Sequence, residues 1–104
     1  MVFIETSIFT ADVVELLGDE DYGELQRFLS GTPDAGDLIK DTGGLRKVRW
    51  AAKGKGKRGG VRVIYYYLPA CSQIRMLLIY RKGVQDSLSA KEKAVLRKIN
   101  EGWK

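Results

Sequence analysis

The sequence contains no histidine and only one cysteine, Cys71, among its 104 residues. Imidazole is essential to Ser-His-Asp triads and Cys-His dyads, and histidine and cysteine together form most structural zinc sites. These catalytic and metal-binding classes are therefore excluded, as is a disulfide bond within the chain. An active site in this protein has to use other side chains, and we expect neither a metal ion nor another cofactor.

Long hydrophobic runs are also missing. The longest apolar stretches, Val63–Leu68 and Met76–Tyr80, are much shorter than the roughly 18 residues of a membrane span. The N-terminal residues lack the basic segment and the cleavage pattern of a signal peptide. With 44% hydrophobic residues and this length, the chain is expected to form one soluble, cytoplasmic domain that does not enter a membrane.

Acidic residues are absent from the whole segment 42–85, although the chain has thirteen of them. The same segment holds eleven of the eighteen basic residues: Arg46, Lys47, Arg49, Lys53, Lys55, Lys57, Arg58, Arg62, Arg75, Arg81 and Lys82. Cations at this density repel one another unless a polyanion neutralises them, so the segment favours nucleic-acid binding. The alternative is a solvated basic surface without a partner.

Hydrophobic periodicity predicts an α+β fold in the order β-α-α-β-β-β-α, with a small antiparallel β-sheet, two N-terminal helices and one C-terminal helix. Expected strands cover residues 2–5, 45–52, 61–68 and 74–80, and a short edge element lies near 38–39. Expected helices cover 7–17, 20–29 with Asp19 as its cap, and 90–103. Ser89 and Glu92 match a capping box, and the last helix has an apolar stripe of Val95, Leu96 and Ile99.

Side chains alternate between the two faces of a strand, so Val48 and Trp50 are expected in the core, with Lys47 and Arg49 on the opposite face. In the next strand, Arg62 shares its face with Ile64, Tyr66 and Leu68. Neighbouring strand ends then bring a set of cations together around one hairpin, with Lys82 on its far side: Arg49, Lys53, Lys55 and Arg62.

The connecting segment 54–60 reads GKGKRGG, which is similar to a phosphate-binding loop. A Walker A loop needs Gly-Lys-Ser/Thr at its end, but Gly59 is followed by Gly60 and Val61, and the loop joins two strands. Nucleoside triphosphate binding is therefore excluded. We expect a flexible cationic loop that contacts a phosphodiester backbone.

The segment Gly43–Leu68 (GGLRKVRWAAKGKGKRGGVRVIYYYL), together with Leu77–Lys82 and Asp86–Ser89, resembles the RelE/ParE superfamily of bacterial toxins, and most of all its HigB-like, RelE-type branch. The resemblance implies a RelE-like domain over residues 1–104. It also implies the toxin component of a type II toxin-antitoxin system, which cleaves messenger RNA on the ribosome without a metal ion. Its partners would be mRNA, the ribosome and a cognate HigA-like helix-turn-helix antitoxin. The toxin would contact DNA only indirectly, through this antitoxin.

The resemblance also assigns roles by motif. The catalytic residues would be Lys47, Arg49, Arg62 and Lys82, with Arg62 stabilising the transition state and Lys82 or a loop lysine assisting proton transfer. Contacts with RNA or the ribosome would come from Lys53, Lys55, Lys57, Arg58, Arg46, Arg81 and Tyr66. The general base stays open, because there is no histidine and Trp103 is the only aromatic residue after Tyr80.

Two other functions and one other residue role are compatible with the sequence. A ParE-like poison of DNA gyrase would bind a protein and cleave nothing, and a regulatory RNA-binding domain would bind without catalysis. The converging cations favour RNA as the target over gyrase, since a gyrase poison needs no converging phosphate ligands. For Tyr66, core packing is the alternative to stacking on RNA.

Overall fold

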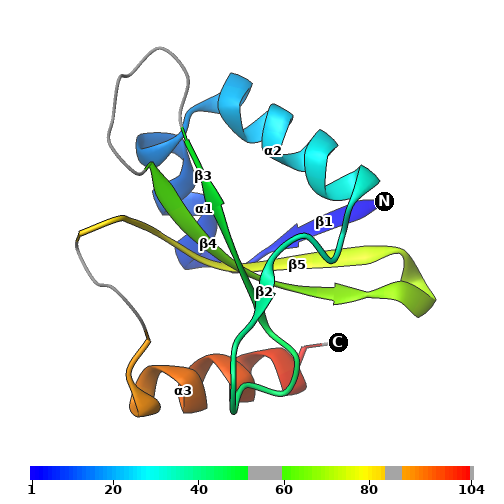
Figure 1. Cartoon of the computed structure of the whole chain (residues 1–104), viewed down its shortest axis with the longest axis vertical. Coiled ribbons are helices and arrows are strands. Elements are labelled where there is room, and N and C mark those ends of the chain that lie inside the picture. Colours follow the sequence, from blue (N-terminus) through cyan, green and yellow to red (C-terminus); the bar gives the residue numbers. More distant parts are fainter. Residues whose placement is uncertain (52–59, 84–87, 104) are drawn as a thin grey trace.

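A computed structural model of the chain describes residues 1–51, 60–83 and 88–103. Its elements are β1 (Val2–Glu5), α1 (Ser7–Leu16), α2 (Asp19–Gly31), β2 (Asp37–Leu38), β3 (Arg46–Trp50), β4 (Val61–Leu68), a 3-10 turn (Pro69–Cys71), β5 (Gln73–Arg81) and α3 (Ala90–Glu101). The predicted α+β class is confirmed, and the elements follow the predicted order with one addition, β2, which lies close to the edge element expected near 38–39 (Figure 1).

The strands form one five-stranded sheet in the order β1-β5-β4-β3-β2. Strands β3, β4 and β5 form the predicted antiparallel meander, and β2 extends it at one edge. The expectation of an antiparallel sheet is wrong for β1, which pairs with β5 in parallel and makes the sheet mixed. The partner of β1 lies some seventy positions away in the chain, so no local pattern indicates its direction.

The helix ends follow local side-chain chemistry with one exception. Thr6 caps α1 by accepting a hydrogen bond from the Phe9 amide at 3.1 Å, and the predicted capping box of Ser89 and Glu92 opens α3. Asp19 is not the cap of α2, as predicted, but its first residue, because Gly18 turns the chain with a φ of +83°. In the first turn the Asp19 carboxylate still interacts favourably with the helix dipole.

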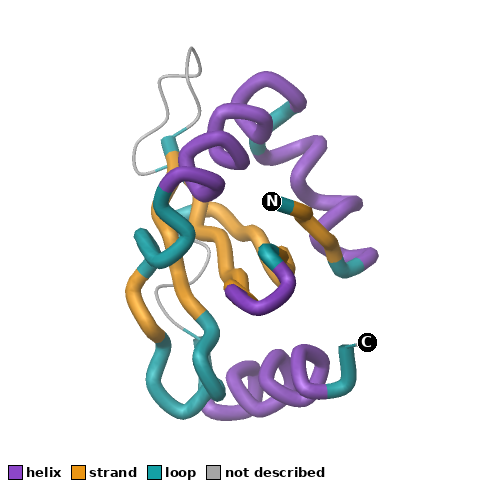
Figure 2. The backbone as a smooth tube through the Cα atoms, turned by 90° about the vertical axis from the view of Figure 1, so that its right-hand side faces the viewer, coloured by secondary structure: helices purple, strands orange, loops and turns teal. Residues whose placement is uncertain are grey.

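Helices cover both faces of the sheet (Figures 1 and 2). Helices α1 and α2 bury one face, where the core includes Phe9, Val13, Leu25, Leu29, Val48, Val63, Tyr65, Ile74 and Met76. Helix α3 packs on the other face over a smaller core of Leu45, Ile64, Leu77, Tyr80, Leu88 and Leu96. No helix in the described parts of the chain is long and apolar enough to cross a membrane.

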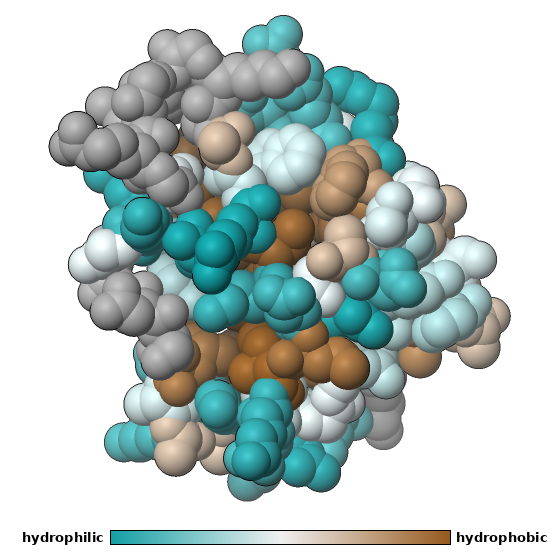
Figure 3. Space-filling view, in the orientation of Figure 1, coloured by the Kyte–Doolittle hydropathy of each residue, from teal (hydrophilic) through white to brown (hydrophobic). Residues whose placement is uncertain are grey.

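The apolar stripe predicted for α3 is only partly buried. Leu96 is 7% exposed, but Val95 and Ile99 are 50% and 44% exposed. Figure 3 shows an apolar area at the surface between the sheet and α3. Helix α3 is therefore held to the sheet by fewer apolar contacts than its sequence suggests.

Candidate nucleic-acid interface

Three side chains form a row across the central strands. Arg49 of β3 lies opposite Arg62 of β4, and Arg62 lies opposite Tyr80 of β5. Residues paired in this way share one face of the sheet, here the face that carries α3. Lys47 is on the same face, opposite Ile64. This register confirms that Lys47 and Arg49 share a face, and of the predicted cluster of cations it brings Arg49 and Arg62 together.

The reason for this arrangement is the alternation of β3. Val48 and Trp50 pack with the core under α1 and α2, so Lys47 and Arg49 have to project from the opposite face. Arg49 is exposed, and Lys47 and Arg62 are partly buried. The face therefore presents cations beside the apolar core that α3 covers, which suits a ligand that has phosphates.

Gly60 and Lys82 lie where β4 begins and β5 ends, beside the row of Arg49, Arg62 and Tyr80. Gly60 has a φ of +56°, and a Cβ atom there would lie 2.1 Å from the Trp50 carbonyl oxygen. The Lys82 amide donates a hydrogen bond to the Gly60 carbonyl at 3.2 Å, so the pairing of β4 and β5 continues to the exposed Lys82. The chain thus leaves the sheet at Lys82, next to the start of β4. The predicted RNA-binding residues Lys53, Lys55, Lys57 and Arg58 lie outside the described residues.

Two predicted RNA-binding arginines are not brought to this row. Arg46 pairs with Tyr65 on the opposite face, and its Nη1 donates hydrogen bonds to the carbonyls of Gly36 at 2.7 Å and Asp34 at 3.2 Å. Arg81 pairs with Val61, again on the face of α1 and α2. Arg46 holds the turn before β2, and both residues are separated from Arg49 and Arg62 by the sheet.

Tyr66 lies on the face of Arg62, as predicted, but it is partly buried against the α3 core. The guanidinium carbon of Arg75 lies 5.7 Å from the centroid of the Tyr66 ring and 5.5 Å from that of Trp103. Arg75 Nη1 also donates to the carbonyl and the Oδ1 of Asn100, both at 3.1 Å. Core packing therefore accounts for the position of Tyr66, and Arg75 fixes the end of α3.

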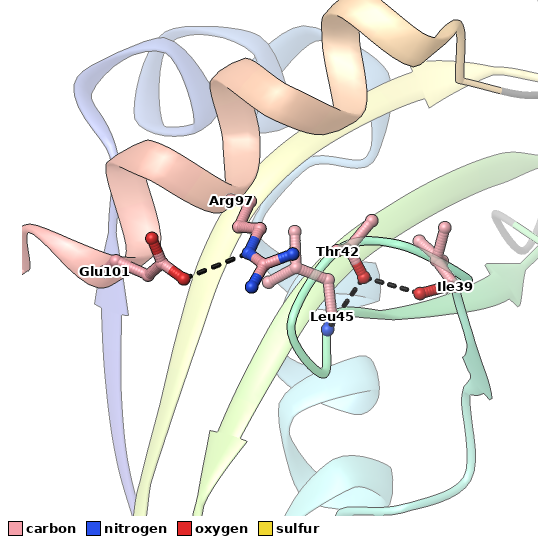
Figure 4. Close-up of polar contacts among 5 residues, drawn as sticks. All are labelled: Ile39, Thr42, Leu45, Arg97 and Glu101. Carbon is pink, nitrogen blue, oxygen red and sulfur yellow. Dashed lines mark hydrogen bonds and ion pairs between the residues drawn. The ribbon is translucent and has the colours of Figure 1, made fainter.

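The turn before β3 lies beside α3 (Figure 4). Thr42 is 1% exposed, and its hydroxyl donates to the Ile39 carbonyl at 2.6 Å and accepts from the Leu45 amide at 3.2 Å. Arg97 of α3 lies against this turn and forms an ion pair with Glu101 at 3.0 Å. The turn that precedes the strand with Lys47 and Arg49 thus lies next to α3, and the contact of Arg97 with it is exposed.

Sequence reasoning missed Tyr80 as a member of the row. Its side chain is 7% exposed, and its hydroxyl has no hydrogen-bond partner among the described residues. Burial raises the pKa of Tyr80, Glu92 raises it further, and Arg62 lowers it. At neutral pH the side chain is an uncharged phenol, which can donate a hydrogen bond but cannot act as a base.

A comparison with protein-family models gives no match for this chain. Its function is therefore inferred from the side chains of the row and their positions.

Proposed function

We propose that this protein is a RelE-like toxin that cleaves messenger RNA on the ribosome without a metal ion. The observation that carries the proposal is the pairing of Arg49 with Arg62 on one face of the sheet. Like charges directly opposite each other destabilise an antiparallel pair. An anion bound between them would be attracted by both guanidinium groups, and RNA supplies one phosphate per nucleotide.

In the proposed reaction the 2′-oxygen of a ribose bonds to the adjacent phosphorus, and the bond from phosphorus to the 5′-oxygen breaks. The proton of the 2′-hydroxyl is removed, another is delivered to the 5′-oxygen, and the products are a 2′,3′-cyclic phosphate and a 5′-hydroxyl. Guanidinium groups bind phosphate oxygens in pairs of hydrogen bonds, so Arg49 and Arg62 would neutralise the charge that develops on the nonbridging oxygens. Lys47 and Lys82 would hold the neighbouring backbone or deliver the proton.

The proposed partners follow from the same face. A strongly cationic surface fits an acidic segment of an antitoxin, which would cover the face or displace α3 beside it. In the first case Lys53, Lys55 and Lys57 are protected from amine labelling in the complex. Equal labelling of these lysines in free and bound toxin would contradict direct coverage. The antitoxin would bring the complex to DNA, and the toxin itself would act in the cytoplasm.

The test is codon-resolved mapping of RNA ends in a translation extract. We expect cleavage by the wild-type protein and a loss of about 100- to 1,000-fold for Arg62→Ala, because one preorganised donor to the developing anion is removed. Arg27→Ala is the matched control, since Arg27 is an exposed arginine of α2 in the opposite layer. Circular dichroism checks that both variants are folded.

Each competing function predicts a different result in the same extract. Breaks in DNA that depend on gyrase, with intact mRNA, would identify a ParE-like poison. Binding to ribosomes or RNA without new RNA ends would identify a regulatory domain. Undiminished cleavage by Arg62→Ala at equal protein level would remove Arg62 from the site.

A further inference from the structure

The buried hydroxyl of Tyr80 differs from that of Tyr65, a fully buried tyrosine on the neighbouring strand. The Tyr65 hydroxyl donates to the Pro33 carbonyl at 2.7 Å and accepts from the Gly36 amide at 2.9 Å. The Tyr80 hydroxyl has no such partner among the described residues. An unsatisfied buried hydroxyl is destabilising, and phenylalanine would fill the same space without this cost. The hydroxyl therefore points to a use outside the fold.

The surroundings of Tyr80 indicate an anion as the missing partner. Tyr80 pairs with Arg62, and Arg62 pairs with Arg49, so the phenol ends a row of two cations. Burial raises the pKa of Tyr80, and the charges of Glu92 and Arg62 act on it with opposite signs. The side chain stays protonated, which makes it a neutral donor beside two charged donors.

We propose that Tyr80 is a third ligand of the anion site: its hydroxyl donates a hydrogen bond to a nonbridging oxygen of the phosphate bound by Arg49 and Arg62. That this phosphate belongs to RNA rests on the proposed function, but the donor itself needs only a phosphate. The hydroxyl is closed from solvent in this structure. Binding of the phosphate therefore requires that the side chains covering the hydroxyl move, and Arg62 is the cross-strand neighbour of Tyr80.

Such a donor acts more strongly in the transition state than in the ground state. Negative charge grows on the nonbridging oxygens as the 2′-oxygen adds to phosphorus, and a preorganised donor in a dry site stabilises that charge. The proton stays on Tyr80 throughout. Tyr80 is thus a catalytic residue for charge stabilisation, distinct from the groups that transfer protons.

The first test is stability, with Tyr80→Phe and Tyr65→Phe as a matched pair. Tyr80→Phe should unfold at the wild-type temperature or slightly above it, because its hydroxyl makes no hydrogen bond within the described residues. Tyr65→Phe should unfold about 5–15 °C lower, because a buried amide and a partly buried carbonyl lose their hydrogen-bond partner. An equal loss in both variants would assign Tyr80 a structural hydrogen bond and overturn the proposal.

The second test measures binding and cleavage by folded Tyr80→Phe. We expect it to bind a non-cleavable RNA hexamer with 2′-O-methyl riboses about three- to tenfold more weakly than wild type. Single-turnover cleavage at saturating ribosome should fall by about 10- to 1,000-fold. Wild-type affinity together with a wild-type rate would overturn the role of Tyr80.

The proposed function and this inference fail separately. If the wild-type protein cleaves RNA and Arg62→Ala does not, wild-type binding and cleavage by Tyr80→Phe reject Tyr80 alone. If the wild-type protein cleaves nothing, but Tyr80→Phe and Arg62→Ala both weaken binding of the hexamer, the proposed function is rejected and the phosphate ligand stands.

Discussion

Replacing Arg75 by alanine should weaken the attachment of α3 to the sheet, and much more than replacing Arg97 does. Arg75 Nη1 donates to the carbonyl and the Oδ1 of Asn100, and Nε donates to Gln73 Oε1 at 3.0 Å. Its guanidinium also lies within 6 Å of the ring centroids of Tyr66 and Trp103. One side chain thus joins β5, β4 and the end of α3.

The expected magnitude follows from these contacts. Hydrogen bonds from a charged donor contribute about 1.5–3 kcal/mol, and each cation–π contact contributes about 0.5–1 kcal/mol. Because all of them share one side chain and are only partly buried, we expect Arg75→Ala to lower the free energy of unfolding by about 2–4 kcal/mol. In a domain of this size that corresponds to a melting temperature about 10–25 °C lower.

The assay is urea and thermal unfolding followed by circular dichroism and by fluorescence. In a Trp50→Phe background Trp103 is the only tryptophan, so its emission reports release of the α3 end. Arg97→Ala is the control, because the Arg97–Glu101 ion pair is exposed and should contribute at most about 0.5 kcal/mol. A wild-type melting temperature for Arg75→Ala, or an equal loss in both variants, would refute this account of α3.

Three further predictions concern other parts of the molecule. Arg46→Ala should lower the free energy of unfolding by about 1–3 kcal/mol in urea titrations, because its guanidinium holds two backbone carbonyls, and cleavage by the folded protein should persist. Replacing Lys53, Lys55 and Lys57 by glutamine should weaken ribosome association. The slope of the logarithm of the association constant against the logarithm of the salt concentration should fall by about one unit for each phosphate that is no longer bound, and single-turnover cleavage at saturating ribosome should be retained. Unchanged affinity at every salt concentration would contradict a binding role for these lysines. Stability should fall as the pH rises above about 10, because Tyr22, Tyr65 and Tyr80 have a raised pKa in the folded protein and the unfolded chain loses its phenolic protons first. The tyrosinate absorbance of the protein should therefore rise in two steps, and these three tyrosines should contribute to the second step, together with unfolding.

The sequence by itself determined the local elements and the face of most side chains on β3 and β4. The alternation of Val48 and Trp50 with Lys47 and Arg49 is a property of consecutive residues, so it predicts which face each side chain takes. The same holds for the capping box that opens α3. Composition alone excluded imidazole chemistry, and the clustering of cations indicated an anionic ligand.

The tertiary structure alone decided what depends on distant partners. The parallel pairing of β1 with β5 and the contact of Arg75 with Asn100 join segments that no local pattern connects. Burial of Leu96 without Val95 or Ile99 depends on the angle at which α3 meets the sheet.

The position of Tyr80 shows the physical reason most clearly. Strict alternation from Ile74 and Met76 would place Tyr80 with them in the core under α1 and α2. The register of β4 and β5 shifts between Ile64 and Tyr65, so β5 contains one extra residue there. A single inserted residue moves every later side chain to the opposite face, and it brings Tyr80 beside Arg62. The strand's own residues predict its alternation, but only its pairing with β4 determines where that alternation is interrupted.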